Sequence, residues 1–198
     1  MESRKVDSDM RPNSIRLNNG FTLIEILITL SLAGIVISIV LSLLITNIRM
    51  FHKTDKDIEL QQQGQFIIGF LEEKILESDK IVYLENMDNE LKHDTNEKLN
   101  VKKIIFKNSP SAKDQGYIFY LSKDLNANTY NLKYGKGLSG AATVEVGNYI
   151  EKIQIEPIPL NSKYTEAKGI TIILYFNIDE QKKSFTTQLC FRNSQRRY

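Results

Sequence analysis

The hydrophobic and polar positions of this chain follow three successive patterns. Residues 21–48 are almost all apolar, with Glu25 as the only charge, and a helix needs about 20 such residues to cross a bilayer. Residues 49–78 mix apolar and polar positions at helical spacing, which is typical of an amphipathic helix. From residue 101 onwards the two kinds alternate, as in half-buried strands. The pattern predicts a long N-terminal helix, membrane-spanning in its first half and amphipathic in its second, followed by a sheet.

The amphipathic segment is predicted to continue the apolar helix without a break. It contains no proline and is rich in helix formers, so we expect one helix from about residue 22 to residue 78. Gly64 and Gly69 each weaken a helix by roughly 1 kcal/mol and are candidate positions for a bend. The apolar positions expected near one face are Phe51, Ile58, Ile68, Leu71 and Ile75, with Phe66 and Phe70 as an i, i+4 pair beside them.

The rest of the chain predicts an antiparallel sheet that packs on the helix, an α+β fold. Residues 79–100 are expected to form a connection, polar and exposed from residue 86, and residues 101–192 the sheet. The candidate strands are 101–107, 116–122, 129–134, 143–157 (in two pieces), 169–178 and 182–192. Short turns between them favour antiparallel pairing, and the last two are expected to form a hairpin around Asp179 and Glu180.

Glu25 is the residue that the apolar pattern does not explain. A charged side chain at the bilayer centre costs roughly 2.5 to 3.5 kcal/mol on insertion scales, and less toward the helix ends. If the chain is cut after Gly20, a new amine appears at Phe21, about one helical turn from the Glu25 carboxylate. That carboxylate could then compensate the amine of its own chain or that of a neighbouring helix.

The stretch GFTLIEILITL, with its basic leader, closely resembles the processing site of type IV prepilins and type II secretion pseudopilins. The resemblance implies that a prepilin peptidase cuts between Gly20 and Phe21 and methylates the new amine of Phe21. It implies that Glu25 sets the axial register of assembly and that the sheet domain has a pilin fold. The implied partners are that peptidase, other pilins of the same filament, an inner-membrane assembly platform and membrane lipid. An ordinary signal anchor is the alternative.

The resemblance divides the chain into a leader (1–20), a transmembrane or filament-core helix (21–48) and a globular head (49–198). The leader lacks an apolar core, unlike a secretory signal peptide. Arg11 and Arg16 precede the apolar segment and favour a cytoplasmic leader. We therefore expect a single-pass protein of the cytoplasmic membrane with its head outside, and later an extracellular filament. Either Met1 or Met10 can be the start.

A second, weaker resemblance concerns the kind of subunit. Residues 60–81, LQQQGQFIIGFLEEKILESDKI, and the terminal Phe191-Arg192-Asn193 look like minor subunits of the PilW and GspJ type. Many major pilins have a helix-bending proline about twenty residues into the mature chain, where this chain has Ser42. A minor pilin or pseudopilin is therefore expected. Pilus, secretion and competence systems all remain open.

The composition offers little chemistry for catalysis or metal binding. His52 and His93 lie far apart in polar settings, and the acids in 85–97 do not match the EF-hand spacing. Residues 135–140 lack phosphate-loop spacing and are expected to form a turn. Cys190, the single cysteine, cannot form an intrachain disulfide and is expected to be a small buried residue. We expect no enzyme activity, no catalytic residue, no metal and no cofactor.

Two alternative functions keep the membrane anchor but assign a different role to the head. A tip-located adhesin or DNA-binding minor pilin of a DNA-uptake filament would use the basic tail of Arg192, Arg196 and Arg197. The net charge of +2 gives such binding no support, and Tyr117, Phe119 and Tyr120 are expected to be core and sheet surface. The other rival is a signal-anchored enzyme, which would keep its N-terminus.

Overall fold

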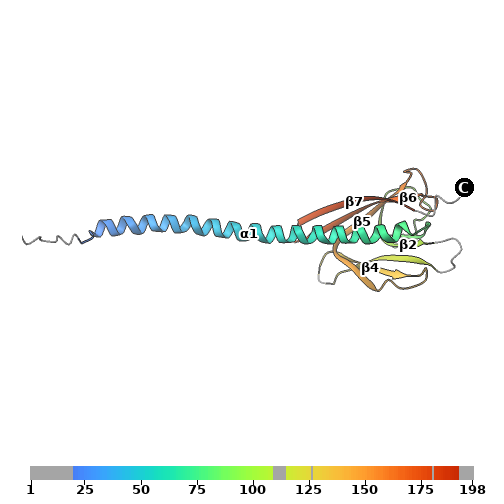
Figure 1. The fold of residues 1–198 in the computed structure, drawn as a ribbon, viewed down its shortest axis with the longest axis horizontal. Helices are drawn as coiled ribbons and strands as arrows, with labels where there is room; N and C mark the ends of the chain where they lie inside the picture. Colours follow the sequence, from blue (N-terminus) through green and yellow to red (C-terminus); the bar gives the residue numbers. More distant parts are fainter. Residues whose placement is uncertain (1–19, 109–114, 126, 180, 192–198) are drawn as a thin grey trace, which may run out of the picture. The chain divides into compact units, whose positions relative to one another are not determined.

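The computed structural model describes residues 20–108, 115–125, 127–179 and 181–191. They form one helix and a seven-stranded sheet, the predicted α+β class (Figure 1). The chain divides into two compact units, Met1–Met50 and Phe51–Tyr198, which are described separately. The elements are α1 (Leu23–Leu76), β1 (Lys80–Asn86), β2 (Leu99–Lys107), β3 (Gly116–Lys123), β4 (Tyr130–Lys136), β5 (Val144–Ile158), β6 (Gly169–Ile178) and β7 (Gln181–Cys190).

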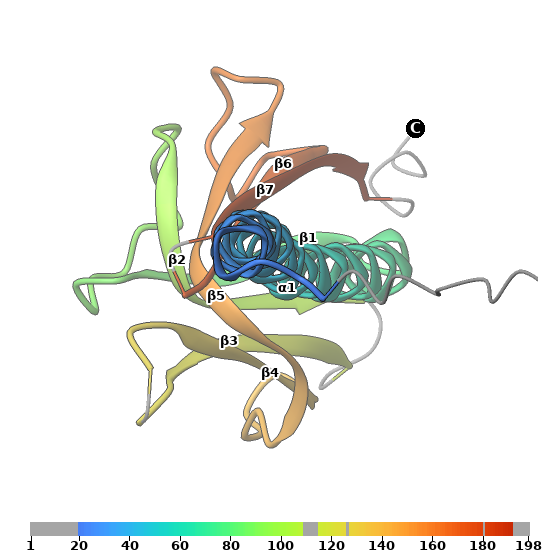
Figure 2. The same cartoon turned by 90° about the vertical axis from the view of Figure 1, so that its left-hand side faces the viewer.

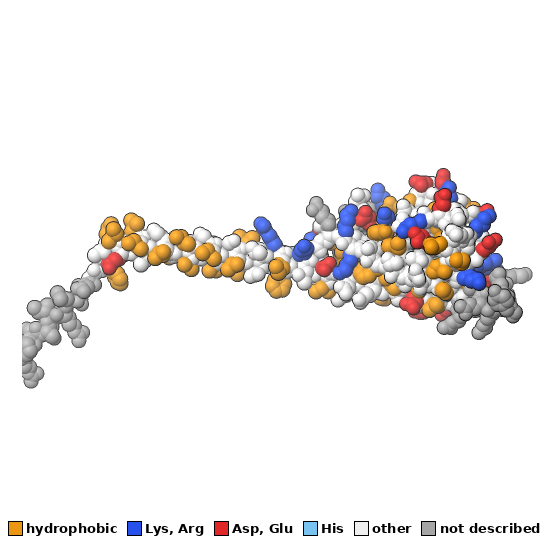
Figure 3. Space-filling model, turned by 90° about the horizontal axis from the view of Figure 1, so that it is seen from above, with side chains coloured by type: hydrophobic (Ala, Val, Ile, Leu, Met, Phe, Trp, Pro, Cys, Tyr) orange, Lys and Arg blue, Asp and Glu red, His pale blue; other side chains and the backbone are white. Residues whose placement is uncertain are grey.

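The first unit contains the apolar part of α1. The helix begins and ends within two residues of the predicted bounds and continues through all its glycines. The large apolar side chains from Phe21 to Met50 are 49–85% exposed, and they cover this part of the helix in Figure 3. By length and composition, α1 is the one helix of the described residues that could cross a membrane. Such a surface requires an apolar environment, either lipid or other helices.

In the second unit, α1 buries one face against the sheet. The buried positions are Leu60, Gly64, Ile67, Leu71 and Ile75, which follow the i, i+4, i+7 spacing of a single stripe. Leu71 and Ile75 are as predicted, whereas Phe51 and Ile58 are exposed, so their assignment to that face is wrong. At about 100° per residue both fall on the side of α1 opposite the buried stripe, because the spacings between the five expected positions do not keep them on one face.

Gly64 is a packing position rather than a bend. A Cβ on Gly64 would lie 2.2 Å from Cε2 of Phe185 on β7, whereas one on Gly69 would meet nothing within 4 Å. The Phe185 ring packs edge-on against Phe176, with centroids 5.7 Å apart. Glycine at position 64 therefore allows β7 to approach the helix closely.

The sheet is antiparallel and partly closed on itself. β2 pairs with β3 through its C-terminal half and with β5 through Leu99–Val101, so that β2, β3, β4 and β5 form a ring of pairings. β1 extends this ring from β2, and the β6–β7 hairpin extends it from β5. In Figure 2, β3 and β4 lie on one side of α1 and β6 and β7 on the other, with β5 running between them. The predicted hairpin is confirmed.

Three strand assignments differ from the prediction. The expected connection 79–100 contains β1, whose Ile81 and Leu84 are buried, because a short strand with bulges does not show clean alternation. The expected two pieces of 143–157 are one strand, β5, with register shifts near its middle. β4 extends to Lys136, so the expected turn at 135–140 begins at Gly137, where φ is 89°.

A buried tyrosine forms hydrogen bonds to the connection before β2 and to β5. The Tyr164 side chain is fully buried, and its hydroxyl lies 2.9 Å from the carbonyl oxygens of both Glu97 and Ile155. Burial, and to a smaller extent the charge of Glu156, raises the pKa of Tyr164 well above its usual range. The phenol of Tyr164 is therefore neutral in the folded chain.

Candidate functional site

The first turn of α1 carries the polar groups that the apolar helix otherwise lacks. Gly20, Phe21 and Thr22 precede the helix and are exposed. Oε2 of Glu25 accepts hydrogen bonds from the backbone N–H and the hydroxyl of Thr22, each at 2.8 Å. The backbone N–H of Glu25 donates in return to Oγ1 of Thr22 at 3.4 Å. This reciprocal arrangement is a capping box, which satisfies N–H groups that a helix leaves unpaired at its start.

The capping box gives Glu25 a role within its own chain. Its carboxylate is held at the helix N-terminus, where the helix dipole favours a negative charge. Phe21, the residue whose amine a cut after Gly20 would release, directly precedes Thr22. The T-x-x-E spacing that forms the box is present in the sequence, but the apolar pattern does not reveal it.

The backbone around Gly20 is open. A Cβ on Gly20 would meet nothing within 4 Å, and the neighbouring Phe21 side chain is 85% exposed. The described residues therefore leave the Gly20–Phe21 peptide accessible from solvent. Such access is what cleavage by another protein requires.

Four of the five remaining hydroxyl groups of the apolar helix are bonded within the helix itself. Thr29 donates to the carbonyl of Ile26, and Ser31, Ser38 and Thr46 donate to the carbonyls four residues earlier, all at 2.8–2.9 Å. Polar groups in hydrocarbon must be satisfied internally, and this back-bonding is how serine and threonine achieve it in helices. These four hydroxyl groups need no water.

Comparison with known proteins identifies a sequence motif in this N-terminal segment. Residues 15–41 match the family model described as the prokaryotic N-terminal methylation motif. The chain therefore carries the N-terminal motif of type IV pilin-like precursors, and the resemblance to the prepilin family is confirmed. That motif is typical of structural proteins that associate with other pilins and with a prepilin peptidase. No curated protein and no solved structure matches the chain.

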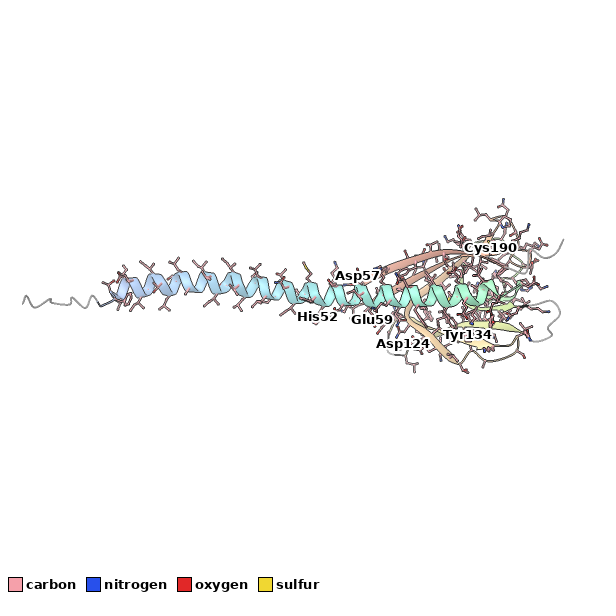
Figure 4. The ribbon with its side chains drawn as sticks, viewed as in Figure 1. His52, Asp57, Glu59, Asp124, Tyr134 and Cys190 are labelled. Carbon is pink, nitrogen blue, oxygen red and sulfur yellow. The ribbon has the colours of Figure 1, made fainter. Side chains whose placement is uncertain are left out.

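Other residues singled out in the sequence lie apart from this segment. His52 is exposed on α1, whereas His93 is half-buried in the connection before β2. Cys190 is exposed, so its expected burial is wrong. Leu189 and Phe191 point into the core, and strand alternation turns the residue between them outward. Figure 4 shows His52 and Cys190 at well-separated positions.

The acidic residues of 85–97 are engaged by protein groups. The side-chain oxygen of Asn86 accepts from the backbone N–H of Asp88 and Glu90. Lys92 lowers the pKa of Glu90, and Lys163 lowers that of Asp94, each first through a hydrogen bond to the carboxylate. Among the residues that the structure describes, no group of three or more His, Cys, Asp or Glu side chains could hold a metal ion.

The expected roles of the β3 aromatics fit the structure. Phe119 is buried, and its ring contacts Phe70 and Tyr134. Tyr117 packs against the core, and Tyr120 lies beneath the ammonium of Lys102. Arg192, Arg196 and Arg197 lie outside the described residues.

Two basic residues, one just before β2 and one within it, are paired with carboxylates. Lys98 pairs with Glu156 at 2.8 Å and Lys102 with Glu85 at 3.7 Å. A nucleic-acid interface requires an uncompensated basic patch. These two ion pairs reduce the positive charge that β2 could offer to DNA.

Proposed function

We propose that this chain is a minor pilin or pseudopilin, a structural subunit of a type IV pilus or of a related secretion or competence filament. The observation that carries the proposal is the methylation motif at residues 15–41, which continues into an apolar helix with an exposed surface. A helix of that kind is stored in the membrane before assembly and packs against other helices in a filament core. The head, residues 49–198, is then displayed outside the cytoplasmic membrane.

Processing would take place at the exposed start of α1. A prepilin peptidase removes the leader, residues 1–20, by cutting between Gly20 and Phe21, and the new Phe21 amine is methylated. The amine then lies next to the Thr22–Glu25 capping box. In this proposal the Glu25 carboxylate compensates the amine of its own chain while the subunit is in the membrane, and it sets the axial register when a neighbouring helix is added.

The proposed subtype is a minor subunit of the PilW or GspJ type. Its support is the sequence of residues 60–81, in which Gly64, Ile67 and Leu71 form the face that packs on the sheet. The same segment places Phe70 against Phe119 and Tyr134. A segment that resembles such subunits thus supplies the contacts between helix and sheet.

The proposal is tested by following the chain into filaments. Epitope-tagged chain is expressed in the native host, and membranes and sheared surface filaments are probed separately. Wild-type chain is expected in both fractions, because processed subunits leave the membrane. A Gly20→Val variant, which blocks the cut, is expected in membranes alone. Gly69→Ala, at an open position of the head helix, serves as the control and should behave as wild type. Equal amounts of the Gly20→Val and wild-type chains in the filament fraction would contradict the proposal.

A further inference from the structure

The last strand of the sheet, β7, has one edge that no other described strand pairs with. The sheet order places β7 at one end, and its ten residues pair with β6 in a register without a shift. The strand contains neither proline nor glycine. A long, regular edge of this kind presents a row of backbone N–H and C=O groups that can pair with another strand.

The register identifies the backbone groups on this edge. The N–H of Phe191 donates to the carbonyl of Lys168 at 2.8 Å, which continues the pairing of Gly169 with Cys190. In an antiparallel pair, every second residue directs both its N–H and its C=O to the partner strand. The odd-numbered residues of β7 therefore bond to β6. The even-numbered residues, whose side chains are exposed, direct their backbone groups to the free edge: Lys182, Ser184, Thr186, Gln188 and Cys190.

The opposite edge of the sheet, on β1, is closed. The pairing of β1 with β2 has two register shifts, and the segment after β1 folds back onto its outer edge. There the N–H of Lys92 donates to the carbonyl of Leu84 at 2.9 Å, and Glu85 forms a bridge with Leu91. Bulges and covering loops are usual ways to protect an edge. The fold thus protects one edge of its sheet and leaves the other open to a partner.

The charges of β7 limit what the open edge can accept. Its lysines, Lys182 and Lys183, lie at the start of the strand and are paired with carboxylates of Glu151 and Asp57 at 3.5 and 3.4 Å. The remaining residues, 184–190, carry no charge. Edge strands are often protected by charged side chains, and this stretch has none. An uncharged segment is therefore the best match for it.

The side chains of β7 define the rest of this chemistry. Ser184, Thr186 and Gln188 are polar and exposed, whereas Phe185 and Thr187 are half-buried on the side of the sheet that faces α1. Pairs of threonine or serine across two strands are favourable, and so are pairs of aromatic with β-branched residues. The matching segment therefore alternates small polar residues with apolar or β-branched ones.

The direction of β7 decides between a second copy and a different chain. Nζ of Lys183 lies 3.4 Å from Oδ1 of Asp57, and the Phe185 ring, further along β7, lies against Gly64. Within the head, β7 thus runs in the same direction as α1 (Figure 1). Two copies that joined their β7 edges antiparallel would have oppositely directed α1 helices, which two subunits anchored in one membrane cannot have. A symmetric parallel pair would set each N–H opposite an identical N–H, so it could not form a parallel ladder.

We propose that the free edge of β7 binds an extended, uncharged segment of a different protein chain, which adds a strand to the sheet beside residues 184–190. Backbone hydrogen bonds to the even-numbered residues supply the affinity, and the alternating side chains supply the specificity. The choice of a different chain rests on the proposed function, since it assumes the membrane anchor. The open edge itself does not.

Hydrogen exchange of the purified full-length chain in detergent micelles tests the edge independently of processing and assembly. The probe is a peptide of residues 181–189, which has the sequence of β7 and can pair Thr186 with Thr186 in antiparallel register. Without the peptide, the amides of Ser184, Thr186 and Gln188 should exchange fast, because they have no strand partner. The peptide should slow their exchange by about tenfold or more.

The amides of Phe185 and Thr187, which bond to β6, are the internal control and should exchange slowly in both samples. If Ser184, Thr186 and Gln188 exchange as slowly as these two without the peptide, the chain covers its own edge and the proposal is overturned. The proposal is also overturned if the peptide, at up to about 1 mM, leaves their exchange unchanged.

Proline variants test whether the backbone of this edge makes the contact. Proline lacks an N–H and is tolerated on an edge strand where that N–H faces solvent, as it does at position 186. Thr186→Pro and, independently, Ser184→Pro should weaken binding of the fluorescent peptide by about tenfold or more and leave the near-ultraviolet circular dichroism unchanged. Thr186→Val keeps the N–H and the side-chain shape, so it should bind as wild type. Wild-type affinity in both proline variants would overturn the proposal.

Light scattering separates a different chain from a second copy as the occupant. Without peptide, the wild-type and Thr186→Pro chains are expected to have the same mass in detergent. A wild-type dimer that Thr186→Pro reduces to a monomer would show that a second copy occupies the edge, and it would overturn the assignment to a different chain.

Discussion

At the residue scale, the Thr22–Glu25 pair joins two tasks that are easily confused. The carboxylate accepts two of the three hydrogen bonds of the capping box, which stabilises the helix start. In the proposed function its negative charge also compensates the amine released at Phe21. A glutamine can close a capping box as well as a glutamate, but it carries no charge. The two tasks can therefore be separated by substitution.

Glu25→Gln is expected to keep the helix start intact and to impair incorporation into filaments strongly. Thr22→Ala removes the cap, which costs about 0.5–2 kcal/mol at the helix start, but keeps the charge, and should assemble much better. The measurement is the amount of processed chain in sheared filaments relative to that in membranes. Efficient assembly of Glu25→Gln, together with poor assembly of Thr22→Ala, would show that capping rather than charge is the task of Glu25.

At the element scale, the contact between α1 and β7 depends on Gly64. A Cβ at this position would lie 2.2–2.6 Å from three atoms of the Phe185 ring. Overpacking of this kind costs about 1–3 kcal/mol, which exceeds the gain in helix propensity. Gly69 is also inside α1 but faces open space.

Gly64→Ala should therefore lower the free energy of unfolding of the head by about 1–2 kcal/mol. Gly69→Ala should raise it by about 0.5–1 kcal/mol, since alanine is the better helix former. Urea unfolding of the full chain in detergent, followed by near-ultraviolet circular dichroism, measures both. If both substitutions stabilised the head, the close approach of Phe185 would not constrain position 64.

The same elements show how far the sequence predicts this fold. The bounds of α1 and most strands follow from local spacing and turn residues, and so does the β6–β7 hairpin. The start of the buried helix face at Leu60, the strand β1 and the pairing of β2 with β5 do not, because each depends on segments distant in the sequence. The GFTLIE motif and its capping box are local in the sequence and can be recognised from it.

At the scale of the whole molecule, a buried phenol makes the free energy of unfolding fall as the pH rises above about 10. The pKa of Tyr164 is raised in the fold by burial, while an unfolded tyrosine titrates near pH 10. Its contribution is complete below about pH 10 and is lost at higher pH, because the unfolded chain then releases a proton that the folded chain keeps. One such group changes the stability by about 1.4 kcal/mol per pH unit in that window.

Tyr164→Phe should destabilise the head by about 1–3 kcal/mol at neutral pH, since the carbonyls of Glu97 and Ile155 lose their partner. Above pH 10 the variant should lose stability less steeply than the wild type, by about one proton per molecule. Unfolding free energies measured between pH 8 and pH 11 give both quantities. Parallel pH profiles for the two proteins would mean that Tyr164 does not stay neutral in the fold.

We propose that the mature form of the molecule begins at Phe21 with a methylated amine. The most direct test is the intact mass and N-terminal sequence of the chain purified from membranes of its native host, with and without the prepilin peptidase. We expect residues 21–198 plus one methyl group in the host that has the peptidase, and the full leader in the host that lacks it. A chain that keeps its leader in both hosts would contradict cleavage after Gly20 and make GFTLIE part of an ordinary membrane anchor.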